Sequence, residues 1–344
     1  MSVNKKLTVS ASPHVRAPHT VTGIMLDVII ALIPSLIAAV VIFGYRVLMV
    51  TLVCVGSAVL SEYVSRIVMK RHQTISDLSA VVTGLLLAFN LPASIPLWIA
   101  ALGSVIAIVV VKQMFGGIGQ NFVNPALASR IILLMSFPSQ MANWATESKF
   151  VTTTATPLAN LSRPTEVMKS FTGASESAEE LPSLLNMFLG LHGGSFGEVC
   201  SVALIIGGIY LVVRKVISPV IPLCYIGTVA VLMLIAGRGS FEFVAYQILG
   251  GGLLLGAIFM ATDYTTSPVS FKGKIIFAVG CGVITTVIRL FGSLPEGVSF
   301  SIILMNLLVP HIEKLTTAKP FGTPKRDRKA EKEAKKAEKE AAKA

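Results

Sequence analysis

The chain has 344 residues, of which 53% are hydrophobic and only 14% are charged, and its mean hydropathy is +0.75. Soluble domains carry about 25% charged residues, so this composition excludes an ordinary soluble protein and predicts an integral membrane protein. The net charge of +11 comes partly from the tail, where 11 of the 29 Lys and Arg residues lie in the last 34 positions. The excess of basic over acidic residues therefore indicates basic cytoplasmic loops and a basic cytoplasmic tail, with no nucleic-acid partner.

Ten apolar runs follow a polar N-terminal segment that is too long and too polar for a signal peptide. A membrane-crossing helix needs about 20 apolar residues. In chain order the runs are 23–44, 48–69, 80–91, 95–114, 122–137, 199–213, 217–236, 243–261, 275–290 and 298–310. The two short runs, 80–91 and 122–137, are bounded by Gly- and Pro-containing stretches, which is typical of broken helices that line a cavity. We predict an all-α integral membrane protein with about ten transmembrane helices in contact with membrane lipid.

The distribution of basic residues predicts the orientation of these helices. With the N-terminus inside, the cytoplasmic segments hold most of the Lys and Arg residues, including the pairs Lys5–Lys6, Lys70–Arg71 and Arg214–Lys215. Both termini are then cytoplasmic, in a cell (inner) membrane. The predicted division is a cytoplasmic segment 1–22, a five-helix repeat 23–138, an extracytoplasmic connection 139–197, a second five-helix repeat 198–312 and a charged cytoplasmic tail 313–344.

Two pairs of similar stretches indicate that the two five-helix repeats are related in sequence. TGLLLAFNLP at 83–92 resembles GGLLLGAIFMATD at 251–263, and FGGIGQNFVNPALASRIIL at 115–133 aligns with FGSLPEGVSFSIILMNLL at 291–308. The copies start five crossings apart, and an odd number of crossings inverts the second copy. Inverted repeats with a broken helix in each half place a binding site at their interface. This architecture is typical of a channel or a secondary transporter.

Four polar side chains at membrane boundaries are candidates for that site. Asn121 and Asn124 lie in the Gly-rich stretch before a helix that we expect to start near Pro125, and they offer amide donors and acceptors. Asp263 ends a long apolar run, where an ionisable residue is expensive and usually functional. Asp77 holds a similar position before the run 80–91. The alternatives are a self-contained turn for the Asn residues and helix caps for both Asp residues.

No metal site is predicted. The four cysteines are isolated within apolar runs, without C-x-x-C spacing, and the five histidines include no pair with ligand spacing along a helix. The polar connection contains VTTTATPLAN at 151–160, a cluster of hydroxyls whose simplest interpretation is a threonine-rich turn fixed by Pro157.

Several motifs together resemble one family. KQMFGGIGQNFVNPALASR, TTATPL, GGSFGE, FMATDYTTSP and LPEGVSFSIILMNLLVP occur in this order between about residues 10 and 311. Their combination is similar to the family that contains RnfD of the Rnf complex and NqrB of the sodium-translocating NADH:quinone reductase. The modest length and the short N-terminal segment fit the Rnf protein better.

The resemblance implies a covalent flavin. Members of the family carry FMN attached through its phosphate to the last threonine of an S/T-G/T-A-T motif, which here reads Thr153-Thr154-Ala155-Thr156. Thr156 is the expected attachment site, with Thr153 and Thr154 as small neighbours in place of the more usual Ser and Gly. A separate flavin transferase would activate the hydroxyl, which is otherwise a weak nucleophile. The resemblance also suggests a second, non-covalent flavin, riboflavin, in the membrane part.

The function that the resemblance implies is electron relay within a larger complex. The complex would transfer electrons between ferredoxin and NAD and couple this transfer to Na⁺ or H⁺ translocation. Its iron–sulfur, NADH/flavin and second covalent-FMN chemistry would lie on partner subunits, so this chain would not be catalytic alone. The alternatives are the homologous quinone-reductase protein and, from a different class, a channel-like or secondary transporter for a small polar solute.

Overall fold

The computed structural model describes residues 20–143, 183–190, 194–197, 200–292 and 297–316, and within these ranges all regular structure is helical. The prediction of an all-α protein is confirmed. The connection that carries Thr153, Thr154 and Thr156 lies outside the described residues, as do both ends of the chain.

The first half contains α1 (Val21–Phe43), α2 (Tyr45–Val68), η1 (Ile75–Asp77), α3 (Ser79–Phe89), α4 (Leu97–Val105), α5 (Pro125–Ser136) and α6 (Pro138–Met141). A π-helical segment, η2 (Ile106–Gln113), continues α4 without a break. The turn between α1 and α2 is made by Gly44, whose φ of 82° lies in the region that favours glycine. The two longest helices of this half therefore follow each other with one residue between them.

The second half contains α9 (Leu184–Leu189), α10 (Ser201–Val213), α11 (Val220–Ala236), α12 (Phe241–Leu249), α13 (Leu253–Leu255), the π-helical η3 (Gly256–Met260), α14 (Phe271–Phe291) and α15 (Val298–Thr316). Serine side chains cap α12 and α14, where Ser240 accepts from the Phe243 N–H and Ser270 from the Gly273 N–H. Between α12 and the α13–η3 segment the chain bends by 66° at a Gly-rich break.

Four helices are long and apolar enough to cross a membrane, namely α1, α2, α14 and α15, and the bent pair α12 and α13–η3 would make a fifth. The other apolar helices have 10–17 residues; they are Ser79–Phe89, Leu97–Gln113, Pro125–Ser136, Ser201–Val213 and Val220–Ala236. Each predicted apolar run coincides with one of these elements, so the chain is a multi-pass membrane protein. That all ten runs cross the membrane stays a prediction.

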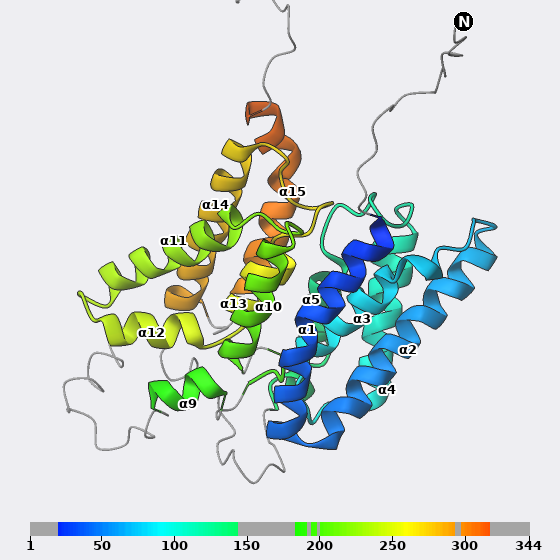
Figure 1. Ribbon diagram of the computed structural model, residues 1–344, viewed down its shortest axis with the longest axis horizontal. Helices are drawn as coiled ribbons and strands as arrows, with labels where there is room; N and C mark the ends of the chain where they lie inside the picture. The colour runs from blue at the N-terminus through cyan, green and yellow to red at the C-terminus, as the bar shows by residue number, and fades with distance from the viewer. Residues whose placement is uncertain (1–19, 144–182, 191–193, 198–199, 293–296, 317–344) are drawn as a thin grey trace, which may run out of the picture.

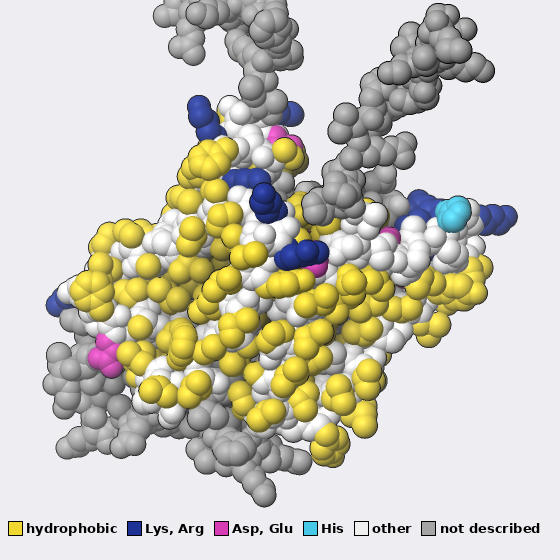
Figure 2. Space-filling view, in the orientation of Figure 1, with side chains coloured by type: hydrophobic (Ala, Val, Ile, Leu, Met, Phe, Trp, Pro, Cys, Tyr) yellow, Lys and Arg dark blue, Asp and Glu magenta, His cyan; other side chains and the backbone are white. Residues whose placement is uncertain are grey.

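The two halves form two lobes that meet along α1 and α10 and along α5 and α15 (Figure 1). The described chain begins, at α1, and ends, at α15, on the same side of the molecule (Figure 1). Figure 2 shows apolar side chains over the flanks and basic side chains along that same upper end. The exposed basic residues of the described chain include Lys70, Arg71, Lys215, Lys272 and Lys314.

The contacts between α5 and α15 are reciprocal. When Phe115 is aligned with Phe291, Asn306 of α15 becomes the counterpart of Arg130 of α5. Arg130 donates to Ser299 Oγ at 2.9 Å, near the start of α15. When the Asn306 amide is oriented so that its oxygen and its nitrogen both have hydrogen-bond partners, the oxygen accepts from the Asn124 N–H at 3.3 Å, at the start of α5. Each helix thus contacts the beginning of the other from the same position, as two-fold-related elements do.

Candidate functional site

A cavity of about 330 Å³ lies where the two lobes meet. Its walls come from α1, α3, the Gly-rich loop before α5, the end of α10, and the segment that follows η3. Most of the lining is apolar, including Val28, Leu86, Leu211 and Phe259. The polar groups on the lining are Ser79, Thr83, Lys112, Asn121, Asn124, Thr262, Asp263, Tyr264 and Thr265. Apolar walls with a few polar groups in a volume of this size are typical of sites for small organic ligands.

Asn121 and Asn124 both lie on this cavity, and both side chains are buried. The Asn121 amide donates to the Val123 carbonyl at 3.2 Å. Asn124 is the N-cap of α5, which starts at Pro125 as the sequence predicts, and its Oδ1 accepts from the N–H groups of Ala126 and Leu127. Two of the free N–H donors at the start of α5 are therefore taken by Asn124 itself. Its amide nitrogen donates across the lobe interface to the Met260 carbonyl at 3.3 Å, so Asn124 connects the halves.

Asp263 contributes the one carboxylate among the described lining residues. It lies in the turn that follows η3, beyond the end of the bent span, and its carboxylate accepts from the hydroxyls of Thr265 at 3.0 Å and Thr266 at 3.1 Å. Burial raises the pKa of this carboxyl above its ordinary value, and these hydrogen bonds oppose the rise. Asp263 does not cap α14, because Ser270 does that. The structure thus brings Asn121, Asn124 and Asp263 to one cavity.

Asp77 is not part of the cavity lining. It is half-buried at the end of η1, and its Oδ1 accepts from both the N–H of Ser79 at 3.0 Å and the hydroxyl of Ser79 at 2.6 Å. Asp77 thus satisfies the first free N–H of α3 from the position before the N-cap, Leu78, in line with the capping role that the sequence left open as an alternative. Ser79 itself lines the cavity, so Asp77 lies directly behind a lining residue.

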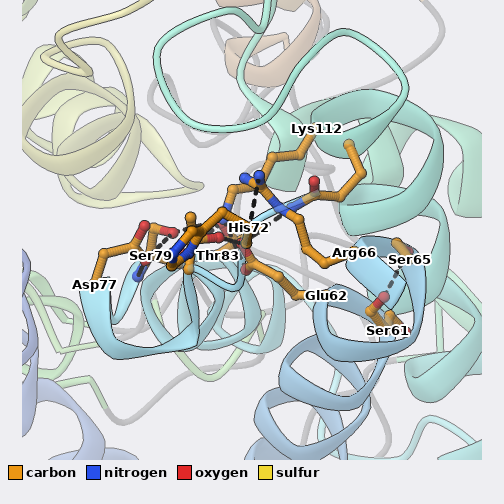
Figure 3. A network of polar contacts seen from close by, with 11 residues as sticks. Ser61, Glu62, Ser65, Arg66, His72, Asp77, Ser79, Thr83 and Lys112 are labelled. Atoms are coloured by element: carbon orange, nitrogen blue, oxygen red, sulfur yellow. Dashed lines mark hydrogen bonds and ion pairs between the residues drawn. The ribbon is translucent and has the colours of Figure 1, made fainter. Parts of the chain in front are cut away.

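A buried ion pair beside the cavity was not predicted from the sequence. Lys112 Nζ lies 3.0 Å from Glu62 Oε2, and the two side chains are 4% and 0% exposed. Glu62 Oε1 also accepts from Thr74 Oγ1 at 2.8 Å and Gln113 Nε2 at 3.0 Å, while Lys112 donates to Ser79 Oγ at 2.6 Å (Figure 3). The sequence did contain a signal for this pair, because a charged residue inside an apolar run is rare and usually functional. Lys112 lies in such a run, at 95–114, and Glu62 in the run 48–69.

A second ion pair joins the two lobes. Asp27 of α1 lies within a span and accepts from the hydroxyl of Tyr210 at 2.9 Å and from Arg214 at 3.3 Å, both on or next to α10. The helices approach closely here, since a Cβ on Gly207 would lie 2.2 Å from the Ala31 carbonyl oxygen. The wall of the cavity formed by α1 and α10 is therefore held by tight packing and by an ion pair between the lobes.

Comparison with known proteins decides the family. Residues 8–322 match the model of the NQR2, RnfD, RnfE family. The chain belongs to this family. The D subunit of the Na⁺-translocating ferredoxin:NAD⁺ oxidoreductase complex of Acetobacterium woodii is 48% identical over 327 residues, which cover 94% of this chain and 98% of that protein. The D subunit of the proton-translocating complex of Clostridium ljungdahlii is 41% identical, over 92% of this chain and 96% of that protein.

A third relative extends the family further. The D subunit of the ion-translocating oxidoreductase complex of Stutzerimonas stutzeri is 37% identical over 88% of this chain and 92% of that protein. The resemblance inferred from the sequence motifs is thereby confirmed. These relatives match this family member over 88–94% of its length.

Proposed function

We propose that this chain is the membrane electron-transfer subunit of an Rnf-type complex. It would relay electrons between ferredoxin and NAD through covalent FMN, coupled to Na⁺ or H⁺ translocation. The observation that carries the proposal is the end-to-end similarity to the D subunits of two ferredoxin:NAD⁺ oxidoreductase complexes. These relatives also favour the Rnf branch over the homologous quinone-reductase protein. Nucleotide and iron–sulfur chemistry would be supplied by the partner subunits of the complex, and a flavin transferase would attach the FMN.

Thr156 is the proposed attachment site, with Thr153 and Thr154 beside it in the motif. A phosphoester would keep the flavin on the protein in the extracytoplasmic connection, with both chain ends in the cytoplasm. Bound there, the flavin supplies one-electron and two-electron redox chemistry, and the protein supplies its position and electronic surroundings. The test is a denaturing gel viewed under ultraviolet light. We expect the wild-type band to fluoresce, the Thr156→Val band to be dark, and Thr153→Val and Thr154→Val to keep fluorescence. A fluorescent Thr156→Val band would refute the assignment.

We further propose that the cavity holds the second, non-covalent flavin. Its volume of about 330 Å³ and its apolar walls suit a flat ring system. The amide of Asn121 would hydrogen-bond the ring edge, and Asp263 would face a ribityl hydroxyl or a cation. Asn124 would hold the start of α5 against the second lobe through its hydrogen bond to the Met260 carbonyl. Riboflavin added to the purified chain should bind with quenching of its fluorescence. Unquenched riboflavin at protein excess would contradict this second site.

A second function is favoured by one observation, namely that the cavity is lined by both repeats and contains the Asp263 carboxylate. That position is where secondary transporters bind their substrates. A transporter for a small polar solute would carry no covalent flavin. A dark wild-type band in the same gel, together with solute uptake by proteoliposomes that contain this chain alone, would favour it over electron relay.

A further inference from the structure

A continuous line of hydrogen-bonding groups connects the cavity with the side of the molecule where η1 lies. Lys112 Nζ donates to Ser79 Oγ at 2.6 Å, and Ser79 Oγ donates to Asp77 Oδ1 at 2.6 Å (Figure 3). Each of these three groups can accept and release a proton. The two distances are short enough for direct transfer between neighbours.

The two ends of this line lie in different surroundings. Lys112 and Ser79 are buried and lie on the cavity lining. Asp77 is half-buried, and the loop before it holds the exposed residues Arg71 and His72. This loop follows α2, whose C-terminal end lies at the end of the molecule that gathers basic side chains (Figures 1 and 2). The line therefore runs from the basic end of the molecule to the interior of the cavity.

The charged groups around Lys112 leave this line open. Glu62 Oε2 accepts from Lys112 Nζ at 3.0 Å on the side of α2. The nearby guanidinium groups are engaged elsewhere, because Arg66 donates to the His72 carbonyl at 3.3 Å and Arg71 to the Gln113 carbonyl at 3.0 Å. Glu62 alone would be enough to form an ion pair with Lys112. The Ser79 hydroxyl additionally links the Lys112 ammonium group to the carboxylate of Asp77, which is nearer the surface.

We propose that Lys112 is the proton donor to the ligand of the cavity and that Asp77 and Ser79 resupply its proton from the basic end of the molecule. The inference rests on the proposed second flavin in the cavity. An isoalloxazine ring that gains an electron in an apolar cavity needs a proton to remain uncharged, since an isolated charge there is costly. Lys112 is the one cationic side chain among the described lining residues, and so it is the group able to give that proton.

Atoms and electrons balance in this step. One electron arrives from an iron–sulfur partner of the complex. The Lys112 Nζ–H bond breaks and its proton forms a new N–H bond on the ring, which leaves a neutral amine. The amine takes the hydroxyl proton of Ser79, and Ser79 takes the proton of Asp77, which Asp77 has gained from a hydronium ion of the solvent, leaving water. One electron and one proton have then entered the cavity, and Lys112 is again an ammonium ion.

Ser79→Ala tests the relay, because it removes the central hydroxyl and keeps the Glu62–Lys112 pair. The matched control is Thr51→Val, which removes a buried hydroxyl from α2 that does not line the cavity. The Thr51 hydroxyl donates to the Val47 carbonyl of its own helix, at 2.8 Å. Full-length chain with Thr156→Val, loaded with riboflavin, is reduced by a photogenerated one-electron donor. Proton uptake is followed with a pH-indicator dye, and electron arrival by flavin absorbance.

We expect Ser79→Ala to slow proton uptake, measured per bound riboflavin, by about 10²-fold, the size of effect typical of a lost proton-transfer group. Ser79→Thr should restore the rate, and Thr51→Val should leave it unchanged. Asp77→Asn gives a second test, because an amide keeps the cap to the Ser79 N–H and cannot pass a proton on. Equal proton-uptake rates in the parent, Ser79→Ala and Asp77→Asn would overturn the relay while leaving the riboflavin site intact. Failure of the parent to bind riboflavin would instead overturn the site, and the relay with it.

Discussion

Lys112→Met should strongly destabilise the protein, because it leaves a carboxylate buried without its cation. Glu62 is 0% exposed, and its Oε2 would lose the ammonium group 3.0 Å away. The other oxygen would keep Thr74 and Gln113 as donors, which satisfy hydrogen bonding without neutralising the charge. Breaking a buried pair from one side costs about 3–5 kcal/mol of unfolding free energy, whereas replacing both partners is often neutral. We therefore expect each of Lys112→Met and Glu62→Gln to cost about this much, and the double variant to recover most of it.

The assay is a double-mutant cycle on the purified protein in detergent, with unfolding followed by denaturant titration. Lys272→Met is the matched control, because Lys272 is an exposed lysine at the start of α14, and surface substitutions usually change stability by less than about 0.5 kcal/mol. Simple addition of the two single losses in the double variant would refute the expected coupling. A Lys112→Met variant as stable as Lys272→Met would refute the cost assigned to the unpaired carboxylate.

Packing and orientation give two further predictions. Gly207→Ala should destabilise the α1–α10 contact by about 1–3 kcal/mol, since its new Cβ would lie 2.2 Å from a backbone oxygen. The control is Gly227→Ala in α11, where the new Cβ would have no neighbouring side chain or helix within 4 Å. It should be neutral or stabilising in the same unfolding assay. Equal stabilities for the two would contradict this. In a cysteine-free background, a cysteine at Ala174 should react with an impermeant maleimide added to intact cells, and one at Ala334 should react only after lysis. The opposite pattern would reverse the predicted orientation.

Much of the helical layout could be predicted because it depends on local pattern. Each apolar run became a helix, and the start of α5 followed from Asn124 and Pro125, a capping residue before a proline that tolerates the first helical turn. The short runs 80–91 and 122–137 appear as the short helices α3 and α5, as their Gly and Pro boundaries indicated. The π-helical turns of η2 and η3 carry no comparable sequence signature, so they were missed.

The candidate site was only partly predictable, because it is made by contacts between distant residues. Asn121, Asn124 and Asp263 could be placed together through the repeat, which relates the two halves by symmetry. The pairing of Glu62 with Lys112 spans 50 positions and lies within one half, where the repeat offers no help. Asp77 is recognisable in the sequence as a charge at a boundary, yet its link to Ser79 and onward to Lys112 depends on side-chain geometry that no spacing rule gives.

Whether this family member is a covalent flavoprotein of electron transfer is tested most directly by the intact mass of the purified full-length chain. We predict a mass higher than that of the polypeptide by one FMN phosphoester, lost completely in Thr156→Val and retained in Thr153→Val. A wild-type mass equal to that of the bare polypeptide, from cells that also produce the flavin transferase, would contradict the proposed function.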